Sequence, residues 1–290
     1  MGEILEKQFE LSTPTGAPLR GDLRWKKELS GFREATLPVV VVCHGFKAFK
    51  DWGPFPSIGR YFADCGFVSI VINFSHNGIG KEPRKFVEHE RFAKNTVSLE
   101  IDDVKTVIDE LSRNKFGCSF IDEKRVALVG HSRGGAVCLI TAKEDRRVRA
   151  VAAWSTIAHF NRYTDEQRLR WREKGFVQLH SVSDLKVFRI NTDLLDDIEK
   201  NAERLDLIKA VKELKKPLLI VHGTADIPAK FHEAEQLYAA ADKSMTDFVR
   251  LEGAGHMYGA KHPYKEKSPT LNHVLDVTTT WLHKQLSPEV

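Results

Sequence analysis

Residues 129–135 read Val-Gly-His-Ser-Arg-Gly-Gly, which places a serine in a G-x-S-x-G pattern. A β-branched run at 125–129 leads into this pattern, and a helical run follows it at 136–140. A serine on such a sharp strand-to-helix turn needs small neighbours, which the glycines supply. The turn would raise the Ser132 hydroxyl above a sheet, at a helix N-terminus whose dipole favours negative charge. We therefore predict that Ser132 is a nucleophile; the alternative is a glycine-rich turn with an incidental serine.

Around this turn, short apolar runs alternate with helical patterns. Runs typical of strands covered on both faces occupy 38–43, 67–72, 125–129, 148–154 and 217–221, and a mixed run at 247–251 suits an edge strand. Apolar residues repeat at helical spacing over 95–113, 231–241 and 271–286. Residues 8–11 and 21–25 alternate as an antiparallel edge hairpin does. We predict an α/β fold with a mostly parallel central sheet of about eight strands and helices on both faces.

One region interrupts the alternation and predicts an inserted cap. Residues 157–213 contain no strand of the core type, which divides the chain into a core of 1–156 and 214–290 and a cap of 157–213. Thr164 with Gln167 forms a capping-box pattern and Gly175 a stop signal, which predicts a helix over 165–174. Within the cap we also expect a hairpin from 176–179 and 186–190, and helices at 192–205 and 206–214.

A serine nucleophile needs a base, and the base needs an acid that holds its tautomer. Of the 12 histidines, His256 follows the last predicted strand in a glycine-rich loop that can return over the sheet, whereas His262 lies in a basic context typical of a solvated loop. Asp226 follows the strand at 217–221 on a tight loop and is the predicted acid; the alternative is a helix N-cap. The order Ser132, Asp226, His256 is that of the α/β-hydrolases.

The loop after the strand at 38–43 begins His44-Gly45-Phe46 and predicts an oxyanion hole. The expected donors are the backbone N–H groups of Phe46 and Arg133. We expect His44 to stabilise this loop and His131 to pack under the serine turn. The Arg133 side chain is expected in a structural ion pair, with contact to an acidic substrate as the alternative.

Three further residues are candidates for substrate binding. His76 lies in a polar turn that could edge the pocket, and Trp171 and Phe188 belong to an aromatic set in the cap. The alternatives are a plain turn for His76 and a small hydrophobic core of the cap for the aromatic residues.

Composition narrows the partners. A net charge of +4 is too small to indicate nucleic acid or an anionic membrane. No apolar run approaches the length of a membrane span, and the N-terminus shows no signal-peptide pattern. Four scattered cysteines predict free thiols and a cytoplasmic location. No metal-ligand spacing appears, so we expect no metal and no cofactor. A small-molecule substrate is the expected partner, and the sequence leaves a homodimer open.

Four segments together carry a resemblance to a known fold family. The segments HGF at 44–46, GHSRGG at 130–135, HGTAD at 222–226 and GAGH at 253–256 resemble those of α/β-hydrolases, and the similarity runs from about residue 6 to residue 286. The chain is most similar to dienelactone-hydrolase-like and prolyl-oligopeptidase-like single-domain esterases, which include cinnamoyl (feruloyl) esterases. This resemblance implies a cap over the site.

The departures from these families also carry information. Dienelactone hydrolases proper use a cysteine where this chain has Ser132, and dehalogenases use an aspartate. No propeller domain is expected before the catalytic part, so size-gated oligopeptide hydrolysis is not implied. We predict a serine hydrolase that cleaves carboxylic esters through an acyl-enzyme. An aminopeptidase- or thioesterase-like acyl hydrolase is the main alternative, and a non-catalytic binding module is a weaker one.

Overall fold

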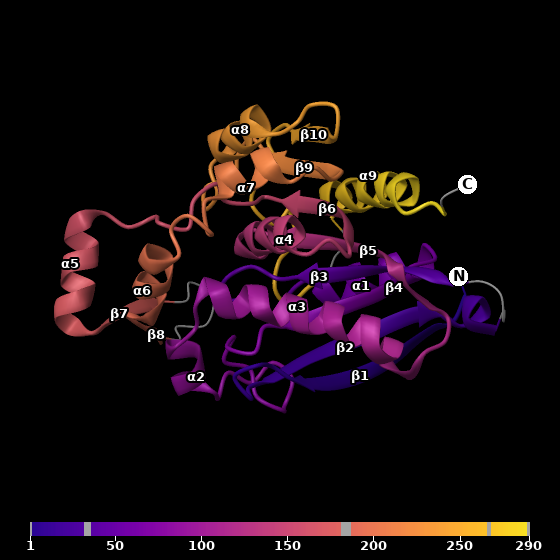
Figure 1. The fold of residues 1–290 in the computed structure, drawn as a ribbon, viewed down its shortest axis with the longest axis horizontal. Helices are drawn as coiled ribbons and strands as arrows, with labels where there is room; N and C mark the ends of the chain where they lie inside the picture. The colour runs from indigo at the N-terminus through magenta and orange to yellow at the C-terminus, as the bar shows by residue number, and fades with distance from the viewer. Residues whose placement is uncertain (1, 32–35, 181–186, 266–267, 289–290) are drawn as a thin grey trace.

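The computed structural model describes residues 2–31, 36–180, 187–265 and 268–288. Its centre is an eight-stranded sheet with the order β1-β2-β4-β3-β5-β6-β9-β10 (Figure 1). The strands are β1 (Ile4–Ser12), β2 (Pro18–Lys26), β3 (Leu37–Cys43), β4 (Val68–Asn73), β5 (Ile121–His131), β6 (Val148–Trp154), β9 (Leu218–Gly223) and β10 (Thr246–Leu251). Six of these strands, β4, β3, β5, β6, β9 and β10, run parallel to one another. β1 and β2 form the predicted antiparallel hairpin at the edge. The predicted fold is therefore confirmed.

Helices cover both faces of this sheet, as predicted. One apolar cluster joins the sheet to α1 (Phe55–Asp64) and α9 (Pro269–Gln285), and a second joins it to α3 (Val97–Asn114), α4 (Arg133–Glu144), α7 (Leu207–Glu213) and α8 (Phe231–Ala240). Successive side chains of β3 alternate between them, because Val39 and Val41 lie in one cluster and Val40 and Val42 in the other. Two short 3-10 helices, Lys27–Gly31 and Lys115–Gly117, follow β2 and α3.

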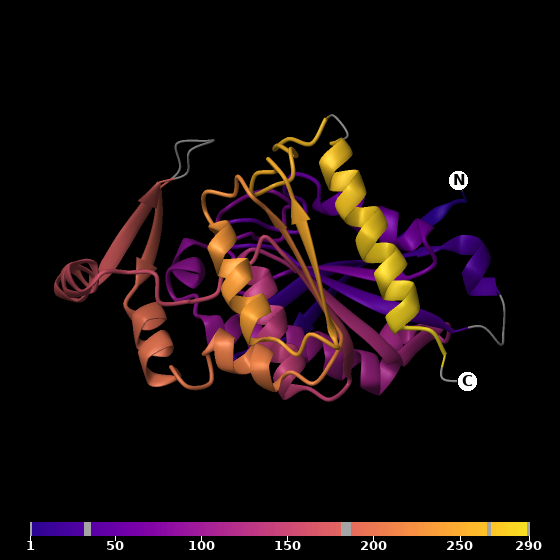
Figure 2. The same cartoon turned by 90° about the horizontal axis from the view of Figure 1, so that it is seen from above.

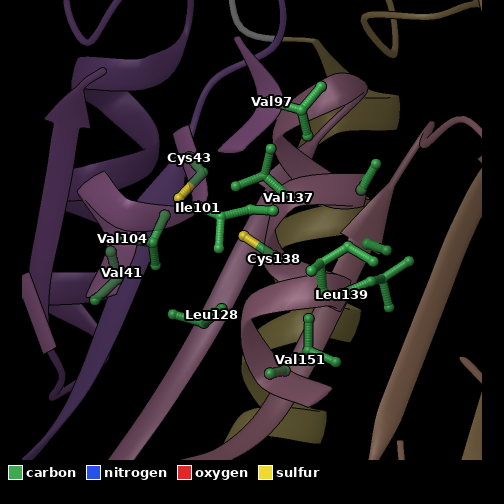
Figure 3. Close-up of a cluster of buried hydrophobic side chains, with 14 of the residues drawn as sticks. Val41, Cys43, Val97, Ile101, Val104, Leu128, Val137, Cys138, Leu139 and Val151 are labelled. Carbon is green, nitrogen blue, oxygen red and sulfur yellow. The ribbon is translucent and has the colours of Figure 1, made fainter. Parts of the chain in front are cut away.

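The helix that follows the serine turn, α4, packs against buried apolar side chains of the core. Val137 and Cys138 of α4 point toward Cys43 of β3 and Ile101 of α3, whereas Leu139 points to the other side of the helix (Figure 3), and all of them belong to one buried apolar cluster. Both cysteines are buried, and all four cysteines of the chain are free thiols. Because this cluster is close-packed, it fixes the start of α4 and hence the serine that precedes it.

The segment between β6 and β9 contains α5 (Asp165–Lys174), β7 (Phe176–His180), β8 (Val187–Asn191) and α6 (Asp193–Lys200). These elements stand apart from the sheet at one end of the molecule (Figures 1 and 2). The capping box of Thr164 and Gln167 is present, and Gly175 ends α5 in the left-handed conformation. β7 and β8 pair as the expected antiparallel hairpin, although residue 186 lies outside the described residues.

The helical part of the predicted cap differs from expectation in its second half. The helix expected over 192–205 ends at Lys200, and α7 packs against α4 and α8 of the core rather than against α5. The cap boundaries at 157 and 213 stay a prediction. A short helix, α2 (His89–Ala93), meets β8, where the ring of Phe188 lies 4.7 Å from Phe86 and 5.2 Å from Phe92. An aromatic contact thus joins β8 to residues 86 and 92, which precede and belong to α2.

No helix within the described ranges is both long enough and apolar enough to cross a membrane.

Candidate active site

Ser132 sits on a strained turn between β5 and α4. Its backbone has φ 55° and ψ −125°, a left-handed conformation that a non-glycine residue rarely adopts. Its N–H donates to the carbonyl of Trp154 at 2.8 Å, and its carbonyl accepts from the Thr156 hydroxyl at 2.9 Å. Such strain persists only where the surrounding structure over-determines it, and it concentrates at functional sites.

The glycines around Ser132 are required by close backbone contacts. A Cβ added at Gly130 would lie 2.4 Å from the carbonyl oxygen of Gly134. A Cβ at Gly134 would lie 2.4 Å from the carbonyl oxygen of His44. Real Cβ atoms do not approach backbone this closely, so the turn closes only with glycine at both positions.

His256 and Asp226 are joined by hydrogen bonds in loops after neighbouring strands. Nδ1 of His256 donates to the carboxylate of Asp226 at 2.9 Å and 3.0 Å. The carboxylate also accepts from the N–H of Ala229 at 2.9 Å, and its side chain is fully buried. Burial acts to raise the pKa of Asp226, but the hydrogen bond and charge of His256 outweigh it, so the pKa is lowered. The aspartate is therefore ionised and fixes the imidazole with Nε2 free of this contact.

The two loops that carry this pair touch each other. β9 and β10 are parallel neighbours, so their carboxyl ends meet at one edge of the sheet. A Cβ at Gly223 would lie 2.1 Å from the carbonyl oxygen of Ala254, so the β9 loop must begin with glycine to let the β10 loop cross it. This approach brings together residues 30 positions apart in sequence.

Two buried histidines support the pair without carrying charge. His131 does not simply pack under the serine turn: its ring lies 4.6 Å from that of His256, and its Nε2 donates to the His256 carbonyl at 2.8 Å. Burial, with the nearby His256, lowers the pKa of His131 to about 3. His222 donates to the carbonyl of Ala229 at 2.8 Å, and burial lowers its pKa as well. Both rings are therefore neutral hydrogen-bond donors that hold the two loops.

The loop after β3 lies against the serine. A Cβ at Gly45 would lie 3.0 Å from the Cβ of Ser132, a contact tighter than side chains usually make, so glycine eases the close approach of this loop. His44 donates from Nδ1 to the Gly45 carbonyl at 2.8 Å, and burial lowers its pKa to about 4. It is thus the loop-stabilising group that the sequence predicts. The backbone N–H groups of Phe46 and Arg133 donate no hydrogen bond to any described residue.

The Arg133 side chain forms the structural ion pair that was expected. Its Nε donates to the Glu100 carboxylate at 2.8 Å, and Asn95 donates to the other oxygen of Glu100 at 2.7 Å. The guanidinium carbon lies 4.9 Å from the ring centre of Phe46. Burial raises the pKa of Glu100 despite the arginine, so the cost of desolvation exceeds the attraction.

Ser132 and His256 line one cavity of about 500 Å³. No direct hydrogen bond joins the hydroxyl to the imidazole among the described contacts, as is common in sites without substrate. The aromatic part of its wall consists of Phe46, Phe49, Trp52, Phe55, Phe86 and Phe188. Such a concave, largely apolar site with a few convergent polar groups is typical of small-molecule binding.

A family model described as the prolyl oligopeptidase family (Peptidase_S9) matches residues 55–286. The chain belongs to this family. YuxL, an uncharacterized peptidase of Bacillus subtilis, is 25% identical over 296 residues, covering 97% of this chain and 39% of that protein. The chain thus spans about two fifths of the length of this relative, and its matches to the other curated relatives span about a third of theirs.

Solved structures confirm the fold of this prolyl oligopeptidase family member. The alpha/beta hydrolase GrgF from Penicillium has a TM-score of 0.73 at 17% identity and covers 98% of this chain and 100% of its own. Est1E from Butyrivibrio proteoclasticus, solved with ferulic acid bound, has a TM-score of 0.70 at 15% identity and covers 97% and 100%. At these identities the likeness establishes the α/β-hydrolase fold.

Of the three predicted substrate-binding residues, the structure brings only Phe188 to the cavity of this family member. His76 is not among the lining residues; its Nδ1 lies 2.8 Å from the Ser75 hydroxyl, and burial, with nearby cations, lowers its pKa to about 4. Trp171 belongs to the core of the cap, where its Nε1 donates to the Ile190 carbonyl at 3.1 Å. His76 and Trp171 thus lie where the alternatives to substrate binding placed them, in a polar turn and in a hydrophobic core.

One wall of the cavity, formed by the loop after β3, was not predicted from the sequence. Phe49 and Trp52 line the cavity, and the ring of His262 stacks on Trp52 at 5.5 Å. Nδ1 of His262 accepts a hydrogen bond from the N–H of Gly53 at 2.8 Å, so this histidine holds the wall. The available signal was the density of aromatic residues over positions 46–55.

Proposed function

We propose that this protein is a serine hydrolase of carboxylic esters. Its main support is the hydrogen-bonded pair of His256 and Asp226, which lines one cavity with Ser132 on its strained turn. In this mechanism Nε2 of His256 takes the hydroxyl proton as Ser132 attacks the acyl carbon. The same imidazole then returns the proton to the leaving alkoxide. A water activated by His256 cleaves the acyl-enzyme to the free acid and restores Ser132.

The tetrahedral intermediates place a negative charge on the former carbonyl oxygen. We assign its stabilisation to the N–H groups of Phe46 and Arg133, which lack other acceptors among the described residues. Arg133 is also the first residue of α4, where the helix dipole adds to this effect. Such donors contribute about 3 to 4 kcal/mol each to transition-state stabilisation.

The family name favours a second candidate, the hydrolysis of aminoacyl amides. An enzyme that removes N-terminal residues binds the substrate's ammonium group, for which a carboxylate in the pocket is the natural partner. Among the described residues that line the cavity, none is aspartate or glutamate. This observation supports esters over aminoacyl amides.

A substrate panel tests the proposal. We expect turnover of nitrophenyl esters to exceed that of aminoacyl nitroanilides and acyl-CoA thioesters, and Ser132→Ala to abolish it. Faster turnover of anilides would favour the peptidase, and faster turnover of thioesters a thioesterase. If no substrate is turned over and a fluorophosphonate leaves Ser132 unlabelled, the protein is a binding module.

A further inference from the structure

The cavity around Ser132 carries positive charge that its walls do not balance. Two of its lining residues, Lys47 and Arg84, have basic side chains, and none of the described lining residues is aspartate or glutamate. A cleft lined by one sign of charge with low-dielectric walls concentrates ligands of the opposite sign.

Neither cation is engaged elsewhere. Across the described ranges, no ion pair or side-chain hydrogen bond involves Lys47 or Arg84, although most arginines of the core have an acidic partner. The acidic residues nearest in sequence already have other partners, because Glu82 pairs with Lys85 and Asp51 with Lys50. Both cations are exposed, so they can meet a ligand at the cavity mouth.

The segment that carries Arg84 is an ordered part of the site. Residues 78–87 fold back on themselves, with Ile79 bridged to Phe86 and the N–H of residue 80 bonded to the carbonyl of residue 85. A Cβ at Gly78 would lie 1.9 Å from the ring of Phe86, so glycine at this position leaves room for the ring. Arg84 therefore lies on a turn that is closed by the bridged residues Ile79 and Phe86, and both of these residues line the cavity.

Both cations also occupy costly backbone conformations. Lys47 has φ 65° and Arg84 has φ 67°, in the left-handed region where glycine or asparagine is accommodated more easily. Among the residues that the structure describes, neither long cationic side chain has an ion-pair or hydrogen-bond partner that accounts for its position. The two observations, unpaired charge and strained placement, occur together at two lining positions of one cavity.

We propose that this site selects esters that carry a carboxylate beside an apolar body, with Lys47 and Arg84 binding the carboxylate and the aromatic wall binding the body. The inference rests on the proposed ester hydrolysis and specifies its substrate class. It does not depend on which side of the scissile bond bears the charge.

Two pairs of substrates, each matched except for one carboxylate replaced by a methyl group, test the proposal. The mono-4-nitrophenyl ester of glutaric acid is compared with 4-nitrophenyl pentanoate, in which a methyl group replaces the carboxylate on the acyl side. On the alcohol side, 4-acetoxybenzoate is compared with 4-methylphenyl acetate. The quantity measured is the ratio of kcat/KM for the anionic ester to that for the neutral ester, taken for each protein, so that intrinsic reactivity cancels between variants.

We expect Lys47→Gln or Arg84→Gln to lower this ratio about threefold, and the double variant about tenfold, in at least one pair. Lys81→Gln is the matched control, since Lys81 is exposed nearby but does not line the cavity. It should leave the ratio unchanged. Raising the salt concentration from about 0.05 M to about 0.5 M should lower the wild-type ratio and not that of the double variant.

The proposal is overturned if the double variant changes neither ratio by more than about twofold, or no more than Lys81→Gln does. This outcome differs from a failure of the proposed function. In that case the wild type would not hydrolyse the neutral esters, or Ser132→Ala would hydrolyse them as well.

Discussion

The buried pair of Arg133 and Glu100 gives a prediction whose magnitude follows from the structure. Their side chains are 10% and 4% exposed, and the Nε to Oε2 distance is 2.8 Å. Replacing Glu100 with Met strands a guanidinium that cannot lose its proton. We expect Glu100→Met to lower the free energy of unfolding by about 3 to 5 kcal/mol.

The loss of unfolding free energy in the opposite variant, Arg133→Met, has an upper limit, because a Glu100 carboxylate left without its partner can take up a proton. Protonating a carboxyl whose ordinary pKa is 4.5 costs about 3 kcal/mol at about pH 7 and less than about 1 kcal/mol at about pH 5. Burial raises the pKa of Glu100 in the folded state, so the folded protein binds this proton more tightly than the unfolded chain. Removing Arg133 raises this pKa further than in the wild type, so the deficit of Arg133→Met should shrink from about pH 7 to about pH 5, by less than about 2 kcal/mol because the wild type gains part of the same stabilisation, whereas that of Glu100→Met should not shrink.

The double variant separates attraction from desolvation. Because desolvation outweighs attraction in this pair, Glu100→Met with Arg133→Met should lie within about 1.5 kcal/mol of the wild type at about pH 7. The assay is urea unfolding followed by tryptophan fluorescence at both pH values. Additive losses in the double variant, or a deficit of Arg133→Met that stays constant with pH, would refute this reasoning.

Three further predictions concern the site and the cap. Gly134→Ala should destabilise the fold by more than about 3 kcal/mol, because its Cβ would lie 2.4 Å from a backbone oxygen. Gly175→Ala, at a positive φ but in open space, should cost about 1 kcal/mol. Similar losses of the two variants in thermal unfolding would contradict the steric argument. Asp226→Asn should lower kcat about 10⁴-fold. Because the pKa of Asp226 is lowered, its ionised form stabilises the fold above pH 3.8 and this stabilisation is lost as the pH falls further, so the variant should show a flatter acid limb in a stability profile; an unchanged kcat or acid limb would count against the pairing with His256. Trp171→Phe should cost about 1 to 2 kcal/mol of stability through the lost bond to Ile190 and leave KM within about twofold; a large rise in KM with unchanged stability would return Trp171 to the substrate site.

Local signals in the sequence were enough to predict the buried strands and several of the helices. The capping box at Thr164 and the stop at Gly175 predicted the bounds of α5 because each depends only on neighbouring residues. The β-branched runs predicted the buried strands for the same reason. The helix α1 was not predicted, although Phe55, Ile58 and Phe62 repeat at helical spacing and lie in the core.

The cavity wall could not be predicted in the same way, because it is assembled from distant loops. The hydrogen bond between Gly53 and His262 joins residues 209 positions apart, and no local pattern encodes it. Trp171 and Phe188 have similar aromatic character, yet Trp171 is buried against Ile190 of β8 and Phe188 lines the cavity. Which role each takes depends on how the cap meets the core. The pair of His256 and Asp226 was predictable because both loops follow strands whose order fixes where their ends lie.

The central claim is that Ser132 is activated by His256, which Asp226 orients. The most direct measurement is the rate and position of labelling by a fluorophosphonate, followed by mass spectrometry of the digested protein. We expect one adduct, on Ser132, formed far more slowly in Asp226→Asn and absent in Ser132→Ala. An adduct at another residue, or a labelling rate that the loss of the Asp226 carboxylate leaves unchanged, would contradict the account.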